Sequence, residues 1–184
     1  RLRSLSLDSV AAALACQRGR ICAWSRSTDT LHILDPDGGP GFFLKRYAYP
    51  TWARRLRGAF RGTFFGEHRA AAERRLLHEM RLLGIPAVRP VAYGARRLGH
   101  FVTVSFLITE EVPDAWNLTA FAANVAASRT PLTARGRQRL SIALARQVAE
   151  IHIAGFSHGQ LFWRNILVRI GPTGDPEFFF LDAR

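Results

Sequence analysis

The sequence predicts an α+β protein of two lobes, in which a five-stranded antiparallel sheet with one helix precedes a mostly helical part. Three observations support this class. Short apolar runs bounded by turn residues occupy 21–47 and recur at 90–110, as expected for strands. Between them, apolar residues at steps of three and four over 67–83 indicate a helix. The chain beyond these runs has helical periodicity over 117–127 and 133–154.

The first lobe is expected to contain five strands. Their predicted positions are 21–24, 31–34, 41–47, 90–95 and 101–110. The Gly-rich stretch 35–41 resembles a phosphate-binding loop in composition. It lies between the second and third strands, however, and we interpret it as a hairpin turn.

The order of these elements divides the chain into three segments. We expect an N-terminal arm or short helix at 1–20, a first lobe at 21–111 and a second lobe at 112–184. Apolar side chains would anchor the arm: Leu5, Leu7 and Val10.

A short loop after the long predicted helix carries the most specific pattern in the chain. His158 is followed two residues later by Gln160 and seven residues later by Asn165, and then by the apolar run Ile166–Val168. These landmarks are those of a kinase catalytic loop, in which an Asp occupies the middle position. That Asp accepts the proton of the attacking hydroxyl, whereas the neutral Gln160 can form a hydrogen bond but cannot take the proton. The loop therefore predicts the fold more strongly than the activity.

Two further positions fit a site for a nucleotide and magnesium. The aromatic run 177–181 predicts a strand that ends at Asp182, seventeen residues after Asn165, where a kinase places its magnesium-binding acid. Lys45, the one lysine of the chain, lies within a predicted strand. Taken alone, such a lysine would as readily lie on the solvated face of the sheet. With the other landmarks, Lys45 is the candidate to hold the nucleotide phosphates.

A lysine in this role needs a carboxylate partner on the predicted helix. The buried stripe of that helix is marked by three residues: Leu76, Met80 and Leu83. Glu73 lies on the same stripe and Glu79 lies off it. Because a buried carboxylate is costly unless it is paired, we expect Glu73 to face Lys45. The alternative is a helix-surface Glu73 that pairs with an arginine of the same helix.

The chain resembles the lipopolysaccharide core kinases, the heptose and Kdo kinases that share a protein-kinase-like fold. The resemblance rests on FFLKRY around Lys45, AAAERRLLHEMRLLGIPAVRPVAYG around Glu73, FLITEEV at 106–112, and IHIAGFSHGQLFWRNILV with the later FFFLDAR. It spans most of residues 21–184. It implies ATP and Mg²⁺ as cofactors, and a sugar of the lipopolysaccharide core or a related phospho-sugar as acceptor.

The resemblance also assigns roles to individual residues. It implies that Lys45 and Glu73 form the ion pair that holds ATP, that Asn165 and Asp182 bind magnesium, and that Gln160 occupies the position of the general base. Since the chain ends soon after the magnesium-binding position, we expect an incomplete kinase-like domain.

The remaining nucleotide contacts would come from a loop and a hinge. The loop between the first two strands has no glycine, so Ser27 and Thr28 would contact phosphate through hydroxyl groups and backbone amides. The segment 110–114 corresponds to the hinge, where backbone groups of Glu110 and Val112 would hold the adenine.

The charge of the chain is consistent with a phosphate-containing partner. Its 26 basic and 14 acidic residues give a net charge of +12, and arginine suits bidentate contact with phosphate. Four arginines lie in an aromatic-rich segment: Arg54, Arg55, Arg57 and Arg61. They predict contact with an anionic inner-membrane surface or a phosphorylated sugar, and the alternative is a codon bias that replaces lysine by arginine.

The sequence predicts a cytoplasmic protein that is at most peripheral on the inner membrane. No apolar run approaches the roughly 20 residues that a membrane-spanning helix needs. The stretch 10–16 is too short for a signal peptide, and the two cysteines are expected to be reduced thiols.

Three functional interpretations remain open. The first is a phosphotransferase acting on a sugar hydroxyl of the lipopolysaccharide inner core. The second is a pseudokinase-like binding or regulatory module, which Gln160 and the loop without glycine favour. The third, a nucleic-acid-binding domain, is supported by charge alone and by no recognisable nucleic-acid-binding motif, so no nucleic-acid partner is expected.

Overall fold

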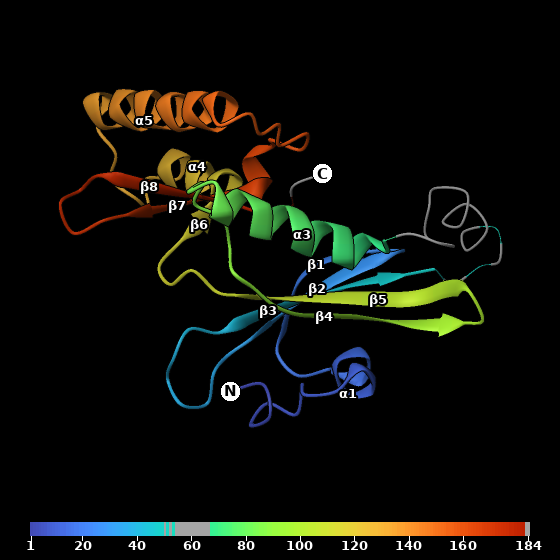
Figure 1. The fold of residues 1–184 in the computed structure, drawn as a ribbon. Coiled ribbons are helices and arrows are strands. Elements are labelled where there is room, and N and C mark those ends of the chain that lie inside the picture. Colours follow the sequence, from blue (N-terminus) through green and yellow to red (C-terminus); the bar gives the residue numbers. More distant parts are fainter. Residues whose placement is uncertain (50, 52, 54–66, 183–184) are drawn as a thin grey trace. The chain divides into compact units, whose positions relative to one another are not determined.

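The structure is a computed structural model of the chain, and it describes residues 1–49, 51, 53 and 67–182 (Figure 1). The chain divides into two compact units, Arg1–Arg75 with Arg89–Pro113, and Leu76–Val88 with Asp114–Arg184. The first unit contains a five-stranded sheet, and the second contains a three-stranded sheet, two complete helices and the end of a third. The predicted α+β class is therefore confirmed.

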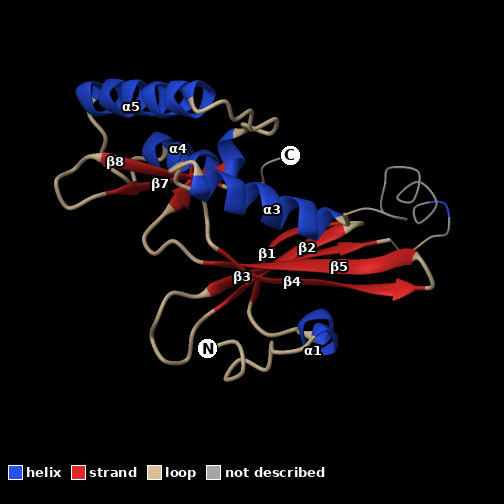
Figure 2. Cartoon of the chain, viewed as in Figure 1, coloured by secondary structure: helices blue, strands red, loops and turns tan. Residues whose placement is uncertain are grey.

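The sheet of the first unit is antiparallel throughout and has the strand order β1-β2-β3-β5-β4 (Figure 2). Its strands are β1 Arg20–Ser25, β2 Thr28–Ile33, β3 Phe42–Ala48, β4 Pro90–Leu98 and β5 Phe101–Glu110. All five predicted strands are present, and the Gly-rich stretch joins β2 to β3 as expected. β2 begins earlier than predicted because the turn after β1 is short.

The N-terminal arm packs on one face of this sheet. Its buried apolar cluster combines sheet residues with arm residues: Leu31, Ile33, Phe42, Leu44, Phe106 and Ile108, with Leu5, Leu7 and Ala13. Within the arm, α1 (Val10–Ala15) begins at Ser9, whose hydroxyl accepts a hydrogen bond from the amide of Ala12 at 3.1 Å. Of the three anchors that the sequence predicted, Leu5 and Leu7 are buried, and the prediction for Val10 is wrong. Val10 is exposed, because α1 turns Ala13 and not its first residue toward the sheet.

Arg46 on β3 fastens the end of α1 to the sheet. Its guanidinium donates hydrogen bonds to the carbonyls of Leu14 at 3.1 Å and Cys16 at 2.6 Å, and it forms an ion pair with Asp29 on β2. Successive side chains of a strand point to opposite faces. Arg46 therefore faces the arm, and Lys45 lies on the other face of the sheet.

The predicted central helix, α3, spans Arg69–Leu82. Its buried stripe is Ala70, Glu73, Leu77 and Met80. The stripe therefore passes through Leu77 rather than Leu76. Leu83 is exposed because the helix has ended before it. Gly84 has a φ of +75°, and the amide of Ile85 bonds back to the carbonyl of Met80 at 2.9 Å, which closes the helix end.

The second unit has two helices and a small sheet. Its elements are β6 Trp116–Asn117, α4 Leu118–Ala126, α5 Ala134–Ile153, a 3₁₀ turn at Trp163–Asn165, β7 Ile166–Ile170 and β8 Pro176–Phe180. Thr133 caps α5 as the sequence predicts, by accepting a hydrogen bond from the amide of Gly136 at 3.0 Å. The strand β6 was not anticipated, because a two-residue strand leaves no periodicity to detect.

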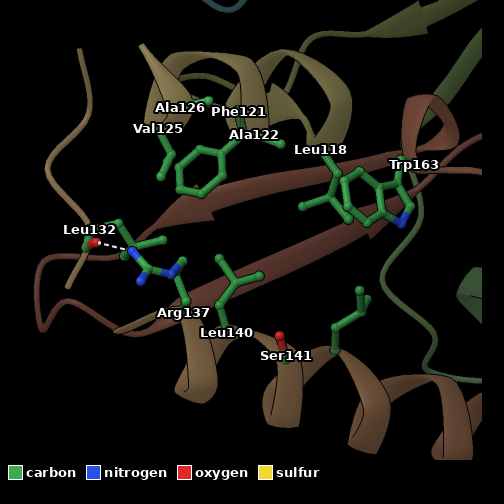
Figure 3. A pocket seen from close by; sticks show the side chains of 11 residues that line it. Leu118, Phe121, Ala122, Val125, Ala126, Leu132, Arg137, Leu140, Ser141 and Trp163 are labelled. Atoms are coloured by element: carbon green, nitrogen blue, oxygen red, sulfur yellow. Dashed lines mark hydrogen bonds between the residues drawn. The ribbon is translucent and has the colours of Figure 1, made fainter. Parts of the chain in front are cut away.

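The facing sides of α4 and α5 enclose a cavity of about 550 Å³ (Figure 3). Its lining is mainly apolar, with Leu118 and Phe121 from α4, Leu140 from α5, and Trp163 beyond them. At one end the guanidinium of Arg137 donates a hydrogen bond to the carbonyl of Leu132 at 2.9 Å. The part of α5 that lines the cavity runs from Arg137 to Leu144.

Candidate functional site

The lysine of β3 and the buried glutamate of α3 form an ion pair. Lys45 Nζ lies 3.0 Å from Glu73 Oε1, and the side chains of Lys45 and Glu73 are 19% and 5% exposed. The register of the sheet places Lys45 beside Thr30 on β2 and Leu107 on β5. Glu79, in contrast, lies on the exposed side of α3. The expected pairing of Lys45 with Glu73 is therefore present in the structure.

Tyr47 contacts the same carboxylate and was missed by the sequence analysis. Its hydroxyl donates a hydrogen bond to Glu73 Oε2, so both oxygens of Glu73 have a donor. The Arg69 guanidinium lies 4.3 Å from the centroid of the Tyr47 ring. The available signal was the alternation of β3, which places Tyr47 on the face of Lys45.

The turn between β1 and β2 is closed by a serine hydroxyl. Ser25 Oγ accepts hydrogen bonds from the amides of Ser27 at 3.3 Å and Thr28 at 3.0 Å. The two backbone amides that were expected to contact phosphate are thus already bonded. For Ser27 and Thr28 the hydroxyl groups remain as the candidate phosphate contacts.

The predicted hinge follows the end of β5. The carboxylate of Glu110 is 2.8 Å from the guanidinium of Arg1 and 3.4 Å from that of Arg89, and the amide of Glu111 donates to the carbonyl of Gly41 at 2.9 Å. Among the residues that the structure describes, the amide of Val112 has no hydrogen-bond acceptor. It is one of the backbone groups of Glu110 and Val112 that the hinge hypothesis assigns to the adenine, whereas the amide of Glu110 already donates to the carbonyl of Arg89 at 2.9 Å.

The loop that carries Gln160 is held by its own backbone. The amide of Gln160 donates to the carbonyl of His158 at 2.7 Å, and the carbonyl of Gln160 accepts from the amide of Phe162 at 2.8 Å and from Asn165 Nδ2 at 2.9 Å. Gly159 has a φ of 64°, a conformation that favours glycine. These bonds use only the backbone of Gln160. Its side chain therefore takes no part in the hydrogen bonds that hold the loop.

Asp182 lies directly beyond β8 and is tied to the same loop. The amide of Leu181 donates to the carbonyl of Asn165 at 3.0 Å, which brings the chain before Asp182 beside the buried Asn165. Asp182 has a φ of 56°. Aspartate adopts this left-handed region more readily than most residues that carry a side chain.

His158 is a buried, packed side chain at the start of this loop. Its ring centroid lies 5.9 Å from that of Phe180 on β8. Burial lowers the pKa of the His158 imidazole, and the charge of Asp182 and the backbone of Leu181 oppose that shift in part. The contact that the His158 ring makes with β8 is therefore the packing against Phe180.

The oxygen atoms of Asn165 and Asp182 are of the chemical type that magnesium prefers. Since Asn165 Nδ2 is used by the carbonyl of Gln160, its amide oxygen is the atom left to act as a ligand. Mg²⁺ is commonly held by one or two protein oxygens, together with water and substrate phosphates. Across the described residues, no group of three or more His, Cys, Asp or Glu side chains could hold a metal. The ion would therefore depend on phosphate oxygens as well.

Comparison with solved structures shows that the fold is protein-kinase-like. The chain superposes on a structure of WaaP in complex with acyl carrier protein with a TM-score of 0.60 and 22% identity, covering 94% of this chain and 63% of that one. It superposes on the kinase domain of maize SIRK1 bound to AMP-PNP with a TM-score of 0.51 and 17% identity, covering 97% of this chain and 55% of that one.

Comparison with sequences identifies the family. Residues 17–183 match the lipopolysaccharide kinase (Kdo/WaaP) family, and the chain belongs to this family, as the sequence predicted. It is 25% identical over 141 residues to the lipopolysaccharide core heptose(I) kinase WaaP of Escherichia coli. That match covers 76% of this chain and 51% of the relative, so the chain spans about half of the relative's length.

Two predictions about membranes came from the sequence, one on a basic and aromatic segment and one on membrane-spanning helices. The arginines of the predicted basic and aromatic segment, Arg54, Arg55, Arg57 and Arg61, lie outside the described residues. Among the helices of the described part of the chain, none is long and apolar enough to cross a membrane.

Proposed function

We propose that this chain is the nucleotide-binding part of an ATP-dependent phosphotransferase that phosphorylates a sugar hydroxyl of the lipopolysaccharide inner core. The observation that carries the proposal is the buried pair of Lys45 and Glu73, found in a chain of the lipopolysaccharide kinase family. Lys45 would bind the phosphates of ATP, and Glu73 would orient the lysine. The name of the E. coli relative, a heptose(I) kinase of the lipopolysaccharide core, supports the choice of acceptor class.

The magnesium site of this proposal consists of the Asn165 amide oxygen and the Asp182 carboxylate. Bound there, Mg²⁺ would neutralise charge on the phosphates. The loop would contribute by holding this ligand in place: Asn165 Nδ2 donates a hydrogen bond to the carbonyl of Gln160, and the amide oxygen is left for the ion.

Gln160 would orient the acceptor hydroxyl without taking its proton. A neutral amide offers a hydrogen-bond donor and an acceptor, but it is not a base at neutral pH. Phosphoryl transfer depends mostly on positioning and on charge stabilisation. A slow transferase is therefore compatible with Gln160.

The second candidate is a pseudokinase-like module that binds a nucleotide or a partner without transferring phosphate. Gln160 is the observation that favours it, because this residue removes the proton acceptor that the catalytic loop normally provides. The two candidates make the same prediction for nucleotide binding and opposite predictions for turnover.

The proposed acceptor and location follow from the family. The acceptor would be a core sugar or related phospho-sugar, on the cytoplasmic side of the inner membrane. The excess of arginine would favour an anionic membrane surface, and no nucleic-acid partner is proposed.

The test is a calorimetric titration of the full-length protein with ATP, with and without magnesium. We expect binding that requires magnesium and that Asp182→Ala weakens by at least about tenfold. Asp175→Ala is the matched control, because Asp175 is an exposed acid of the same unit that pairs with Arg139 at 2.6 Å. No binding, or binding indifferent both to magnesium and to Asp182→Ala, would contradict the proposal.

A further inference from the structure

We propose that Tyr47 is a positioning residue of the nucleotide site, because its hydroxyl holds the second oxygen of Glu73 and so fixes the carboxylate that orients Lys45. The expected effect on nucleotide binding rests on the proposed function. The contacts among Tyr47, Glu73 and Lys45 are present without any ligand.

The backbone of β3 places the two side chains together. Tyr47 follows Lys45 by two residues and therefore lies on the same face of the sheet. Tyr47 is 1% exposed, and its neighbours in the sheet register are Thr28 on β2 and Ser105 on β5. A phenol this deeply buried needs a partner for its hydroxyl, and Glu73 is that partner.

The buried carboxylate of Glu73 in turn requires hydrogen-bond donors, and the Tyr47 hydroxyl is one of them. A buried carboxylate without donors loses the full free energy of its hydration, whereas hydrogen bonds to both oxygens stabilise its charged form. Lys45 Nζ satisfies Oε1 from the partly exposed side, and Tyr47 satisfies Oε2 from the interior. Two donors on opposite oxygens fix the plane of the carboxylate, which one donor alone would not do.

The ring of Tyr47 also explains why Glu73 pairs with Lys45 and not with Arg69. Arg69 lies four residues before Glu73 on α3, which is the spacing of a local ion pair on a helix. Its guanidinium instead lies over the Tyr47 ring at 4.3 Å from the centroid, and within the described residues its buried Nε has no hydrogen-bond acceptor. Tyr47 thus holds Arg69 through its ring face and Glu73 through its hydroxyl. This arrangement leaves Glu73 Oε1 to Lys45.

The first experiment measures ATP affinity in the full-length protein. Tyr47→Phe removes the hydroxyl and keeps the ring, and we expect the dissociation constant of Mg-ATP to rise about tenfold. In a Glu73→Gln background the same change should have no further effect, because the two residues act through one contact. Tyr93→Phe is the control, since Tyr93 is 44% exposed and contacts Arg74 rather than Glu73. Losses that add in the double variant would indicate a merely structural role and overturn the inference.

The second experiment needs no nucleotide. The chain has a single lysine, so ¹³C-lysine labelling of this chain gives one set of side-chain signals in the NMR spectrum. We expect Tyr47→Phe to sharpen the Cε signal and to shift it toward that of a free lysine, while Tyr93→Phe leaves it unchanged. An unchanged signal in Tyr47→Phe would refute the positioning role.

The two experiments separate the inference from the proposed function. If the wild-type protein binds no Mg-ATP, the proposed function fails, and the lysine signal still decides the role of Tyr47. If Mg-ATP binds but Tyr47→Phe changes neither affinity nor signal, only the inference fails. Should Tyr47→Phe not fold, as judged by its urea midpoint, Arg69→Gln takes its place, because it removes the cation that lies 4.3 Å from the ring centroid and so loosens the ring that carries the hydroxyl. The same direction of change in the lysine signal is then expected, and no change would overturn the inference.

Discussion

At the scale of single residues, Gln160 is the position that separates the two candidate functions, because it replaces the proton acceptor of a kinase catalytic loop. The backbone of this residue is fully used by the loop, through the amide bond to His158 and the carbonyl bonds to Phe162 and Asn165. The side chain contributes nothing to these bonds. A change of side chain should therefore alter the chemistry and leave the loop unchanged.

Gln160→Asp tests this in the full-length protein. It supplies a proton acceptor, and a positioned general base contributes a factor of about 10² to 10⁴ in rate. We expect phosphate transfer to purified lipopolysaccharide core acceptors to increase by a factor in that range, measured with labelled ATP at saturating magnesium. An Asp variant that binds ATP but is no faster would show that the base is not limiting, and would favour the pseudokinase-like module.

The two glutamates of α3 provide a second residue-scale test. Glu73→Gln removes the charge that pairs with Lys45, so it should weaken Mg-ATP binding about as much as Lys45→Met. Glu79 lies on the exposed side of the same helix, and Glu79→Gln should leave binding nearly unchanged. Calorimetry of the three variants checks the order. Equal losses from the two glutamate changes would contradict the role assigned to the buried pair.

At the scale of elements, the start of α3 depends on a histidine. The amide of Ala71 donates to the carbonyl of His68 at 2.9 Å and also to His68 Nδ1 at 3.2 Å, so the imidazole adds a side-chain cap to the helix that carries Glu73. Burial lowers the pKa of His68, the charge of Arg97 lowers it further, and Glu67 opposes the shift. Only an imidazole whose Nδ1 is unprotonated can accept this bond.

This cap predicts a dependence of stability on acid. Because the pKa of His68 is lower in the folded state, its contribution is fully present above the ordinary value of 6.5 and is lost as the pH falls from there through the folded value. His68→Ala should lower the free energy of unfolding by about 1 kcal/mol at neutral pH and should reduce its fall on acidification. Urea unfolding between pH 7.5 and 5 measures both effects. His152→Ala is the control, because His152 is exposed. A variant with an unchanged pH profile would refute the capping role.

Local patterns predicted some contacts of these elements and could not predict others. The position of Glu73 follows from helical periodicity alone, although the stripe runs through Leu77 and not through Leu76. The alternation of β3 places Tyr47 on the face of Lys45, but its contact with Glu73 could not be predicted, since that contact depends on which residue of a distant helix faces β3. The bonds of Ser25 to the turn amides were missed for a different reason, because they depend on the geometry of a short turn.

At the scale of the whole molecule, the stability of the first unit should depend on its N-terminal arm. The arm contributes buried side chains to the apolar cluster on the sheet, so the arm and the sheet share one core. Leu7 is 3% exposed and Val10 is 41% exposed, although both belong to the arm.

Leu7→Ala should therefore lower the free energy of unfolding by about 3 kcal/mol, as large-to-small changes in a core do. Val10→Ala removes apolar atoms from a largely exposed position and should cost less than about 1 kcal/mol. Urea unfolding of the two variants gives the comparison. Similar small losses for both would show that the arm is not part of the core.

The adjacent positions of Lys45 and Arg46 have a thermodynamic consequence. One residue of β3 faces the Glu73 carboxylate, and the next faces the carbonyls of Leu14 and Cys16 in the arm. A molecule that displaced the arm would disturb Arg46, and a nucleotide on the other face would engage Lys45. If the two events change one another's free energy through β3, the coupling must be reciprocal: whatever factor the nucleotide imposes on the release of the arm, the release of the arm imposes on the nucleotide.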